Sequence, residues 1–227
     1  MAAETLEKRL PLTGFVEYAP SEMTARVTAF SENLRRRRTV RDYSDRPVDR
    51  AIVEQAILAA GSAPSGANHQ PWHFVVLTDK DRRKRLREAA EAEERAFYAG
   101  KASEEWLEAL APLGTDADKP FLEHAPVLIA VFAQKRGGEK AGQDKKNYYI
   151  NESVGIACGF LLAALHEAGL VTLTHTPNPM RFLNEVCERP ATEKPYMLIV
   201  GGYPAEGATV PEHALVKKSL EDITTWL

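Results

Sequence analysis

The chain has 227 residues, which suits one large domain or two small ones, and a chain of this length buries roughly 70% of its unfolded surface. Lys and Arg total 29 against 32 for Asp and Glu, and the net charge of -3 argues against an overall field that attracts nucleic acid or anionic membranes. Neither of the two cysteines lies at metal-ligand spacing from a second Cys or a His, so we expect no disulfide framework and no metal site. The N-terminus lacks the pattern of a secretion signal, and no apolar run approaches the ~20 residues that span a bilayer. We therefore expect a cytoplasmic protein that binds neither nucleic acid nor membrane.

The first half of the chain predicts an irregular arm, three helices and a strand. Residues 1–20 hold two prolines and no clear periodicity, so we expect a loose arm there. Capping and first-turn residues predict two helices, at 21–38 and 47–60. β-Branched and aromatic residues predict a strand at 73–78, and the highly charged stretch 79–99 predicts a long polar helix.

The second half alternates apolar segments with polar ones. The continuous apolar run 126–132 is typical of a strand covered on both faces, and 137–147 is predicted to be a solvated loop. Residues 151–168 predict a helix that is apolar on nearly every side, which must be deeply buried or lie between subunits. Apolar residues predict two more strands, at 171–174 and 196–200. The last segment, 205–227, has few core residues, so we expect an arm that packs on a second copy. Helices that alternate irregularly with these strands predict an α+β fold.

Two short segments carry the clearest chemical information. The first, Arg35–Arg41, clusters guanidinium groups, which bind phosphate through forked, charge-assisted hydrogen bonds. The second, Ala63–Trp72, is a Pro/Ser/Gly/Asn turn that leaves backbone N–H groups free to meet a planar ligand. Together they predict a pocket for a phosphorylated aromatic cofactor, which we interpret as FMN. Two alternatives for the basic run stay open, a solvated helix face and a nucleic-acid contact, and the second predicts steep salt dependence.

From about Leu34 to the C-terminus the chain resembles the nitroreductase-like flavoproteins, and among them the iodotyrosine deiodinases. The segments that carry the resemblance are Arg37–Arg41, Ala63–Ala67, Tyr148-Tyr149 with Asn151-Glu152, Ile156–Gly159, Ala168–Thr172, Thr174–Pro177, and Gly202–Pro204 with Ala208–Pro211. The resemblance implies a mixed, mostly antiparallel sheet surrounded by helices, in an intertwined homodimer that exchanges its C-terminal arms. It implies an FMN domain at 21–204, between an N-terminal arm at 1–20 and a C-terminal arm at 205–227 that packs on the partner subunit.

The same resemblance implies a helical lid at about 88–122 that closes over the substrate. Glu94, Tyr98 four residues later and Lys119 stand where the deiodinases grip an amino acid zwitterion. Glu94 would bind the ammonium group, Lys119 the carboxylate, and Tyr98 would add one hydrogen bond. Without the resemblance, Glu94 would count as one more solvated acid of this helix, beside Glu88, Glu91 and Glu93.

Cofactor contacts are implied for several segments. The phosphate would be bound by charged and hydroxyl groups of Arg37, Arg38, Thr39, Arg41 and Lys217. The flavin would be contacted across the subunit boundary by Pro64, Ser65 and Gly66. Thr174, His175 and Thr176 would also contact the cofactor. Two residues would act in catalysis: the Ala67 N–H would meet the phenolate oxygen of the substrate, and the Thr176 hydroxyl would face flavin N5 and favour one-electron chemistry.

Some of these positions depart from the family pattern or have simpler explanations. Thr39 stands where the family more often has Ser, and Lys217 where it tends to have an arginine, so the bidentate fork is lost there. His175 replaces a smaller polar residue, and its imidazole could simply face solvent. Thr174 and Thr176 could be plain strand-end residues.

The activity that the resemblance implies is FMN-dependent reductive removal of iodide, or another halide, from halotyrosines in one-electron steps. The electrons would come from NAD(P)H or from a flavin- or ferredoxin-type reductase; the membrane anchor of animal relatives is missing, so a soluble donor is expected. Two alternatives are a broad-specificity NAD(P)H-dependent nitroreductase or enone reductase, and a flavin-binding or sensory module. The Glu94, Tyr98 and Lys119 set favours the deiodinase, because neither alternative needs to grip a zwitterion.

Overall fold

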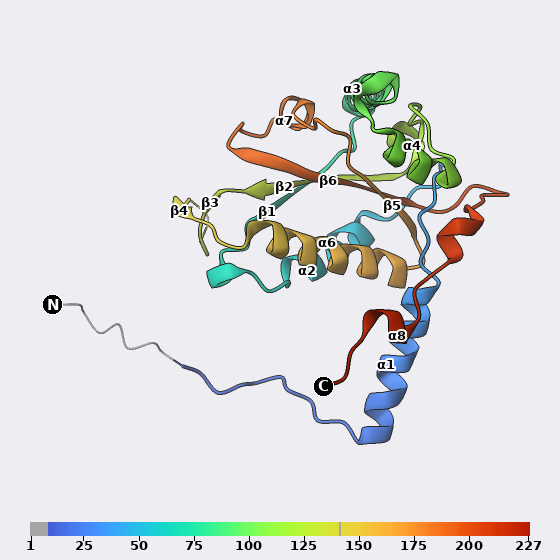
Figure 1. The fold of residues 1–227 in the computed structure, drawn as a ribbon. Helices are drawn as coiled ribbons and strands as arrows, with labels where there is room; N and C mark the ends of the chain where they lie inside the picture. The colour runs from blue at the N-terminus through green and yellow to red at the C-terminus, as the bar shows by residue number, and fades with distance from the viewer. Residues whose placement is uncertain (1–8, 141) are drawn as a thin grey trace. The chain divides into compact units, whose positions relative to one another are not determined.

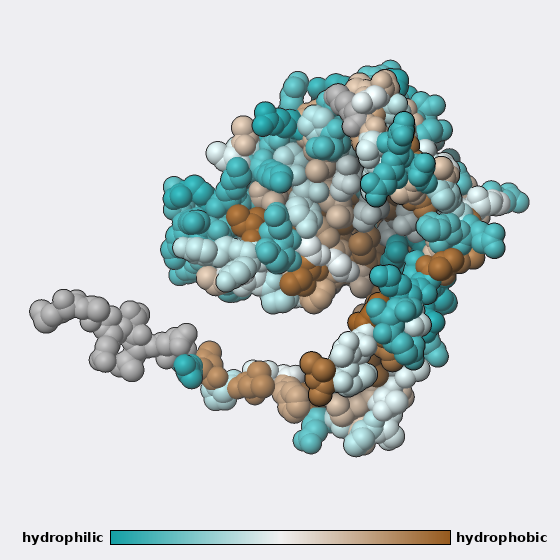
Figure 2. Space-filling model, in the orientation of Figure 1, coloured by the Kyte–Doolittle hydropathy of each residue, from teal (hydrophilic) through white to brown (hydrophobic). Residues whose placement is uncertain are grey.

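The computed structural model describes residues 9–140 and 142–227, and it divides into two units, 1–36 and 37–227, each of which we describe by itself. The first unit has an irregular stretch from Arg9 and one helix, α1 (Pro20–Arg35). No residue of α1 is buried, and Figure 2 shows apolar side chains exposed along this unit. The helix ends three residues before the predicted Arg38, because the following segment is extended and pairs with a strand at Thr39. The functions predicted for the two arms remain predictions.

An antiparallel sheet of four strands lies at the centre of the second unit. In sheet order the strands are β1 (Trp72–Val76), β2 (Val127–Gln134), β6 (Glu193–Gly202) and β5 (Val171–His175). All four predicted strands are confirmed, and the parallel bridge between Thr39 and Thr172 makes the sheet mixed at the outer edge of β5. The predicted α+β fold with a mixed, mostly antiparallel sheet is therefore confirmed.

Helices cover both faces of this sheet (Figure 1). One face carries α2 (Arg50–Gly61) and α6 (Ile150–Glu167), and the other carries α3 (Lys80–Ala96), α5 (Phe121–His124) and α7 (Phe182–Val186). Because side chains alternate along a strand, β2 feeds two separate cores. Ile129 and Val131 belong to the core of the α2/α6 face, and Leu128 and Phe132 to the core of the α3 face. Because both faces of β2 are covered, the whole run 126–132 is apolar instead of alternating with polar residues.

The remaining short elements complete the second unit. After α3 come a π-helical turn, η2 (Phe97–Lys101), and α4 (Glu104–Leu110) with η3 (Ala111–Leu113); the C-terminal segment holds η4 (Glu212–Leu215) and α8 (Leu220–Ile223). None of residues 205–227 is buried, as expected of an arm with few core residues of its own. No helix in the described part of the chain is both long enough and apolar enough to cross a membrane.

The predicted solvated loop at 137–147 is wrong in part, because a short hairpin forms there. β3 (Arg136–Gly137) pairs with β4 (Lys145–Lys146), and the Arg136 Nε donates to Asp144 Oδ1 at 2.5 Å. Contacts between charged side chains stabilise this pairing. The hairpin was not predicted because its strands lack the β-branched and aromatic residues by which strands are recognised.

Candidate active site

The three residues predicted to grip the substrate lie together beside β5. The Lys119 Nζ is 3.4 Å from Glu94 Oε2, and the two side chains are only 3% and 15% exposed. Lys119 also donates hydrogen bonds to Thr115 Oγ1, at 3.2 Å, and to the backbone oxygen of Asp116. The two opposite charges thus face each other in a nearly dry environment, where removal of either partner would leave an uncompensated buried charge.

Glu91 fixes the backbone of the segment that carries Lys119. One helical turn before Glu94, it accepts a hydrogen bond from the Lys119 backbone N–H at 2.9 Å through Oε1. Its side chain is 13% exposed and lies between Arg87, at 3.6 Å, and Arg95, at 3.8 Å. Counting Glu91 among the solvated acids was therefore wrong: α3 uses two successive inward-facing acids, one for the backbone and one for the side chain of Lys119.

Tyr98 joins the same cluster from the π-helical turn η2. Its hydroxyl donates to the backbone oxygen of Thr115 at 3.2 Å, so it shares a partner residue with Lys119. Burial raises the pKa of Tyr98; Glu94 adds to the rise, whereas the hydrogen bond to Thr115 opposes it. Tyr98 therefore stays protonated at neutral pH, and with its one O–H proton on Thr115 its oxygen can accept a hydrogen bond from a ligand.

His175 is buried against this cluster, so the interpretation that its imidazole faces solvent is wrong. Successive side chains of a strand point to opposite faces of the sheet. Thr174 is exposed, and His175 lies on the α3 face together with Leu173, two residues earlier. The ring meets Phe121 edge to face at 5.9 Å, and its Nε2 lies 4.0 Å from Glu94 Oε1. Burial, followed by the positive charges of Lys119 and Arg41, lowers the pKa of His175 to about 3, so the imidazole is neutral in ordinary buffers.

The predicted phosphate-binding arginines lie along the free edge of β5. The Val40 N–H donates to the Thr172 oxygen at 3.2 Å, which fixes the extended segment 37–41 against the strand. Arg37, Arg38 and Arg41 are all half-buried there, in the neighbourhood of the exposed Thr174 on the same strand. Guanidinium groups beside exposed hydroxyls suit the phosphate and polar edge of a nucleotide-like cofactor such as a flavin.

Arg41 also lines an open pocket of about 390 Å³ between the lid segment and the chain before η4. The other residues that line it are Asp42, Ala111–Gly114 and Thr209–Pro211. Arg41 thus borders both the predicted cofactor edge and the lid. Lys217 is exposed, with its Nζ donating to the Ala214 oxygen at 3.0 Å, so within one chain its side chain is occupied locally.

The turn predicted to contact the flavin has a strained, rigid backbone. Ala67, Asn68 and Gln70 all have positive φ angles, of 51°, 54° and 49°, which non-glycine residues rarely adopt. The Ser65 Oγ accepts from the Gln70 N–H at 2.9 Å, whereas the Ala67 N–H has no acceptor among the described residues. Such a turn presents a free N–H in a fixed direction, as an oxyanion contact requires.

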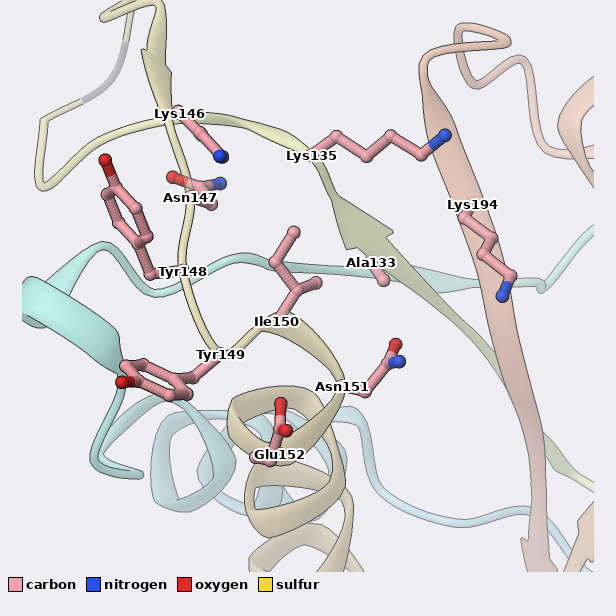
Figure 3. Close-up of a pocket in the computed structure, with 10 residues that line it drawn as sticks. All are labelled: Ala133, Lys135, Lys146, Asn147, Tyr148, Tyr149, Ile150, Asn151, Glu152 and Lys194. Carbon is pink, nitrogen blue, oxygen red and sulfur yellow. The ribbon is translucent and has the colours of Figure 1, made fainter.

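This turn is held against the N-terminal end of α6. The Gly66 N–H lies 3.4 Å from Ser153 Oγ, and a Cβ at Gly66 would come within 2.7 Å of the Tyr148 backbone oxygen, so only glycine fits. Beside it is a pocket of about 490 Å³ in which Lys135, Lys146 and Lys194 come from three different segments (Figure 3). The other residues that line this pocket are Ala133 and Asn147–Glu152. The sequence pointed to Tyr148 and Tyr149 only through the resemblance.

The turn and the Glu94 cluster lie on opposite faces of the sheet. The turn follows α2 and contacts α6, whereas the cluster is built on α3, α5 and the inner side of β5 (Figure 1). One chain therefore does not bring its own Ala67 to its own Glu94. No cluster of three or more His, Cys, Asp or Glu side chains that could hold a metal ion occurs in residues 9–140 and 142–227.

Comparison with known proteins decides the family. The model of the nitroreductase family matches residues 34–203. The chain belongs to the nitroreductase family. Among relatives in this family, it is 50% identical over 203 residues to an iodotyrosine deiodinase of Haliscomenobacter hydrossis, which covers 89% of this chain and 91% of that protein. It is 43% identical over 207 residues to human iodotyrosine deiodinase 1, covering 91% of this chain and 71% of that one.

A solved structure of the nitroreductase family agrees with these relatives. The chain superposes with a TM-score of 0.68 and 30% identity on a crystal structure of oxidised iodotyrosine deiodinase bound to FMN and 3-iodo-L-tyrosine. The match covers 78% of this chain and 90% of that chain. A nitroreductase from Bacteroides fragilis with bound FMN, at 21% identity and a TM-score of 0.62, shares the fold.

Proposed function

We propose that the protein is an FMN-dependent oxidoreductase that removes iodide, or another halide, from halotyrosines. The observation that carries this proposal is the occluded ion pair of Glu94 and Lys119, in a chain that is 50% identical to an iodotyrosine deiodinase. An ion pair in the lid is what a zwitterionic substrate needs, and a general reductase of nitroarenes does not need one.

The ion pair accounts for selection of a zwitterion over simpler ligands. An amino acid can enter between Glu94 and Lys119 and leave every charge paired, with its ammonium on Glu94 and its carboxylate on Lys119. An amine without a carboxylate leaves Lys119 unpaired, and an acid without an amine leaves Glu94 unpaired. Because Lys119 is only 3% exposed, an unpaired charge there is costly, so half-matched ligands are rejected.

The reaction breaks the carbon–iodine bond; iodine leaves as iodide with the bonding electron pair, and the ring carbon takes up a proton. Reduced FMN, when bound, supplies the two electrons that the reaction consumes. The chain itself binds and orients the substrate: the lid excludes water, and the Ala67 N–H stabilises the negative charge of the phenolate oxygen. Thr176 would offer its hydroxyl to the flavin ring, and Arg37, Arg38, Thr39 and Arg41 would hold the phosphate.

The active form that we propose is a homodimer, in which the Pro64–Ala67 turn of one subunit meets the lid of the other. The opposite placement of turn and lid supports it, and so do the exposed apolar residues of α6, Ile156 and Phe160, at 41% and 42%. The C-terminal arm, with Trp226 88% exposed, would pack on the partner. The electron donor would be NAD(P)H or a reductase, and the cytoplasmic location is tested by fractionation of the source cells.

The proposal is tested by titrating the fluorescence of the bound flavin with 3-iodotyrosine, with tyrosine and 2-iodophenol as controls. Quenching by 3-iodotyrosine that weakens strongly with 2-iodophenol is expected, because the phenol lacks both charges that the lid binds. A protein that holds flavin but does not respond to 3-iodotyrosine would instead support a nitroreductase of broad specificity.

Replacing Thr176 by Ala is expected to slow deiodination by roughly 10-fold while leaving two-electron reduction of a nitroarene nearly unchanged. The variant removes one hydroxyl hydrogen bond at the edge where the flavin is proposed to lie, and only the one-electron chemistry depends on it. Thr192→Ala, at an exposed threonine just before β6 and outside the predicted site, is the matched control. Equal losses in both reactions for Thr176→Ala would assign this residue to cofactor binding alone.

A further inference from the structure

The imidazole of His175 has a polar atom that the described structure leaves without a partner. Its Nε2 is buried and has no hydrogen-bond partner, and the nearest carboxylate oxygen, Glu94 Oε1, lies 4.0 Å away. A hydrogen bond requires about 2.7–3.2 Å, so the two atoms are about 1 Å too far apart. Buried polar groups are almost always paired, and an exception next to a binding site needs an explanation.

Of the charged and aromatic groups described around the imidazole, Glu94 is the one that offers an acceptor. Phe121 on α5 presents a ring to the imidazole, and Lys119 and Arg41 are cations that offer no acceptor. Glu94 has two oxygens with separate tasks: Oε2 lies 3.4 Å from Lys119, and Oε1 is directed toward His175. With Oε2 on Lys119, Oε1 stops short of hydrogen-bonding distance to the imidazole.

We propose that His175 is a positioning residue of the substrate clamp, whose Nε2–H binds Glu94 Oε1 when the amino acid substrate draws Lys119 away from Glu94. The inference rests on the proposed function and deepens it. With Lys119 turned to the substrate carboxylate, Glu94 moves about 1 Å toward His175 and is then held from two sides, by the imidazole and by the substrate ammonium.

This arrangement makes His175 favour the bound state over the free one. Its hydrogen bond is missing in the free protein and present in the complex, and only such a difference between two states can increase the affinity for a ligand. In the free protein burial, followed by the positive charges of Lys119 and Arg41, lowers the pKa of His175 to about 3, so the ring is neutral before the substrate binds.

The experiment measures the dissociation constant of 3-iodotyrosine by flavin fluorescence for the FMN-loaded wild type, His175→Leu and His175→Gln. Leu fills a similar volume without a donor, whereas the amide nitrogen of Gln reaches about as far as Nε2. We expect His175→Leu to weaken binding roughly 10-fold and His175→Gln to retain most of the affinity. In a Glu94→Gln background the His175→Leu effect should fall to less than about 2-fold, because the charged acceptor is gone. Each variant is compared at full FMN loading, and its binding of 2-iodophenol, which lacks the ammonium that Glu94 takes, should equal that of the wild type.

The outcomes separate this inference from the proposed function. A wild type that holds FMN but ignores 3-iodotyrosine overturns the proposed function, and this inference with it. A wild type that binds 3-iodotyrosine, with His175→Leu binding equally well, overturns the inference alone. The inference is also overturned if His175→Leu and His175→Gln lose affinity equally, or if the loss persists undiminished in the Glu94→Gln background, since His175 would then serve the fold rather than the clamp.

Discussion

Replacing Glu94 by Gln should weaken the binding of 3-iodotyrosine by roughly 10- to 100-fold while changing the affinity for FMN by less than about 2-fold. The amide cannot neutralise the substrate ammonium, and a charge-assisted hydrogen bond becomes an ordinary one. The measurement is the flavin-fluorescence titration, run beside Glu88→Gln, which removes one exposed carboxylate from the same helix. Equal losses of FMN and 3-iodotyrosine in Glu94→Gln would contradict a lid role for this residue.

Loss of the carboxylate also leaves Lys119 buried without its counter-ion, which costs stability. The double variant Glu94→Gln/Lys119→Met removes both charges and keeps the volume, so it should unfold at a higher temperature than Glu94→Gln. It should nevertheless bind 3-iodotyrosine no better. A double variant that regains both stability and affinity would show that the single variant failed through folding and not through the lost contact.

Two impaired variants should recover activity when they are mixed, measured at a 3-iodotyrosine concentration well below the dissociation constant of Glu94→Gln. Glu94→Gln damages the lid, and Gly66→Ala damages the turn, because the new Cβ meets the Tyr148 backbone oxygen at 2.7 Å. If each site takes its lid from one subunit and its turn from the other, a mixed dimer has one site with both lesions and one intact site. Unfolding and refolding the variants together should then give roughly a quarter of the wild-type activity.

The mixture separates a shared site from a site within one chain. In the second case every site carries one lesion, so no activity returns at any mixing ratio. Each variant alone must first be dimeric by light scattering and retain FMN. If Gly66→Ala fails either criterion, Ser65→Ala replaces it, since that variant removes the acceptor of the Gln70 N–H without adding an atom.

The sequence predicted a helix or strand well where the local pattern of apolar and polar residues matches the burial of those residues in the structure. The run that became β2 is apolar throughout because helices cover both of its faces, and α6 begins and ends within a residue of its predicted bounds. The β3–β4 hairpin was missed because Arg136 and Asp144 stabilise it through a charge pair, which alternation of apolar residues does not reveal. The end of α1 was misplaced because pairing of Thr39 with β5 overrides the helix propensity of the arginines.

The site depended on contacts between segments that no local pattern connects. Only the resemblance linked Glu94 to Lys119. The structure adds Glu91, which accepts a hydrogen bond from the Lys119 backbone N–H. The one sign of this contact in the sequence is that Glu91 lies one helical turn before Glu94. His175 was a different case, because a usable signal existed. Its place two residues after the buried Leu173 predicts an inward side chain, but the short predicted strand ended at residue 174 and hid that alternation.

Product formation from 3-iodotyrosine by the FMN-loaded, chemically reduced protein under anaerobic conditions tests the central proposal most directly. Reductive deiodination predicts equal amounts of tyrosine and iodide, formed faster than with the same concentration of free reduced FMN, and little product from Glu94→Gln. Rapid reduction of a nitroarene by the same preparation, with no iodide released from 3-iodotyrosine, would contradict the account and leave a nitroreductase whose lid grips some other zwitterion.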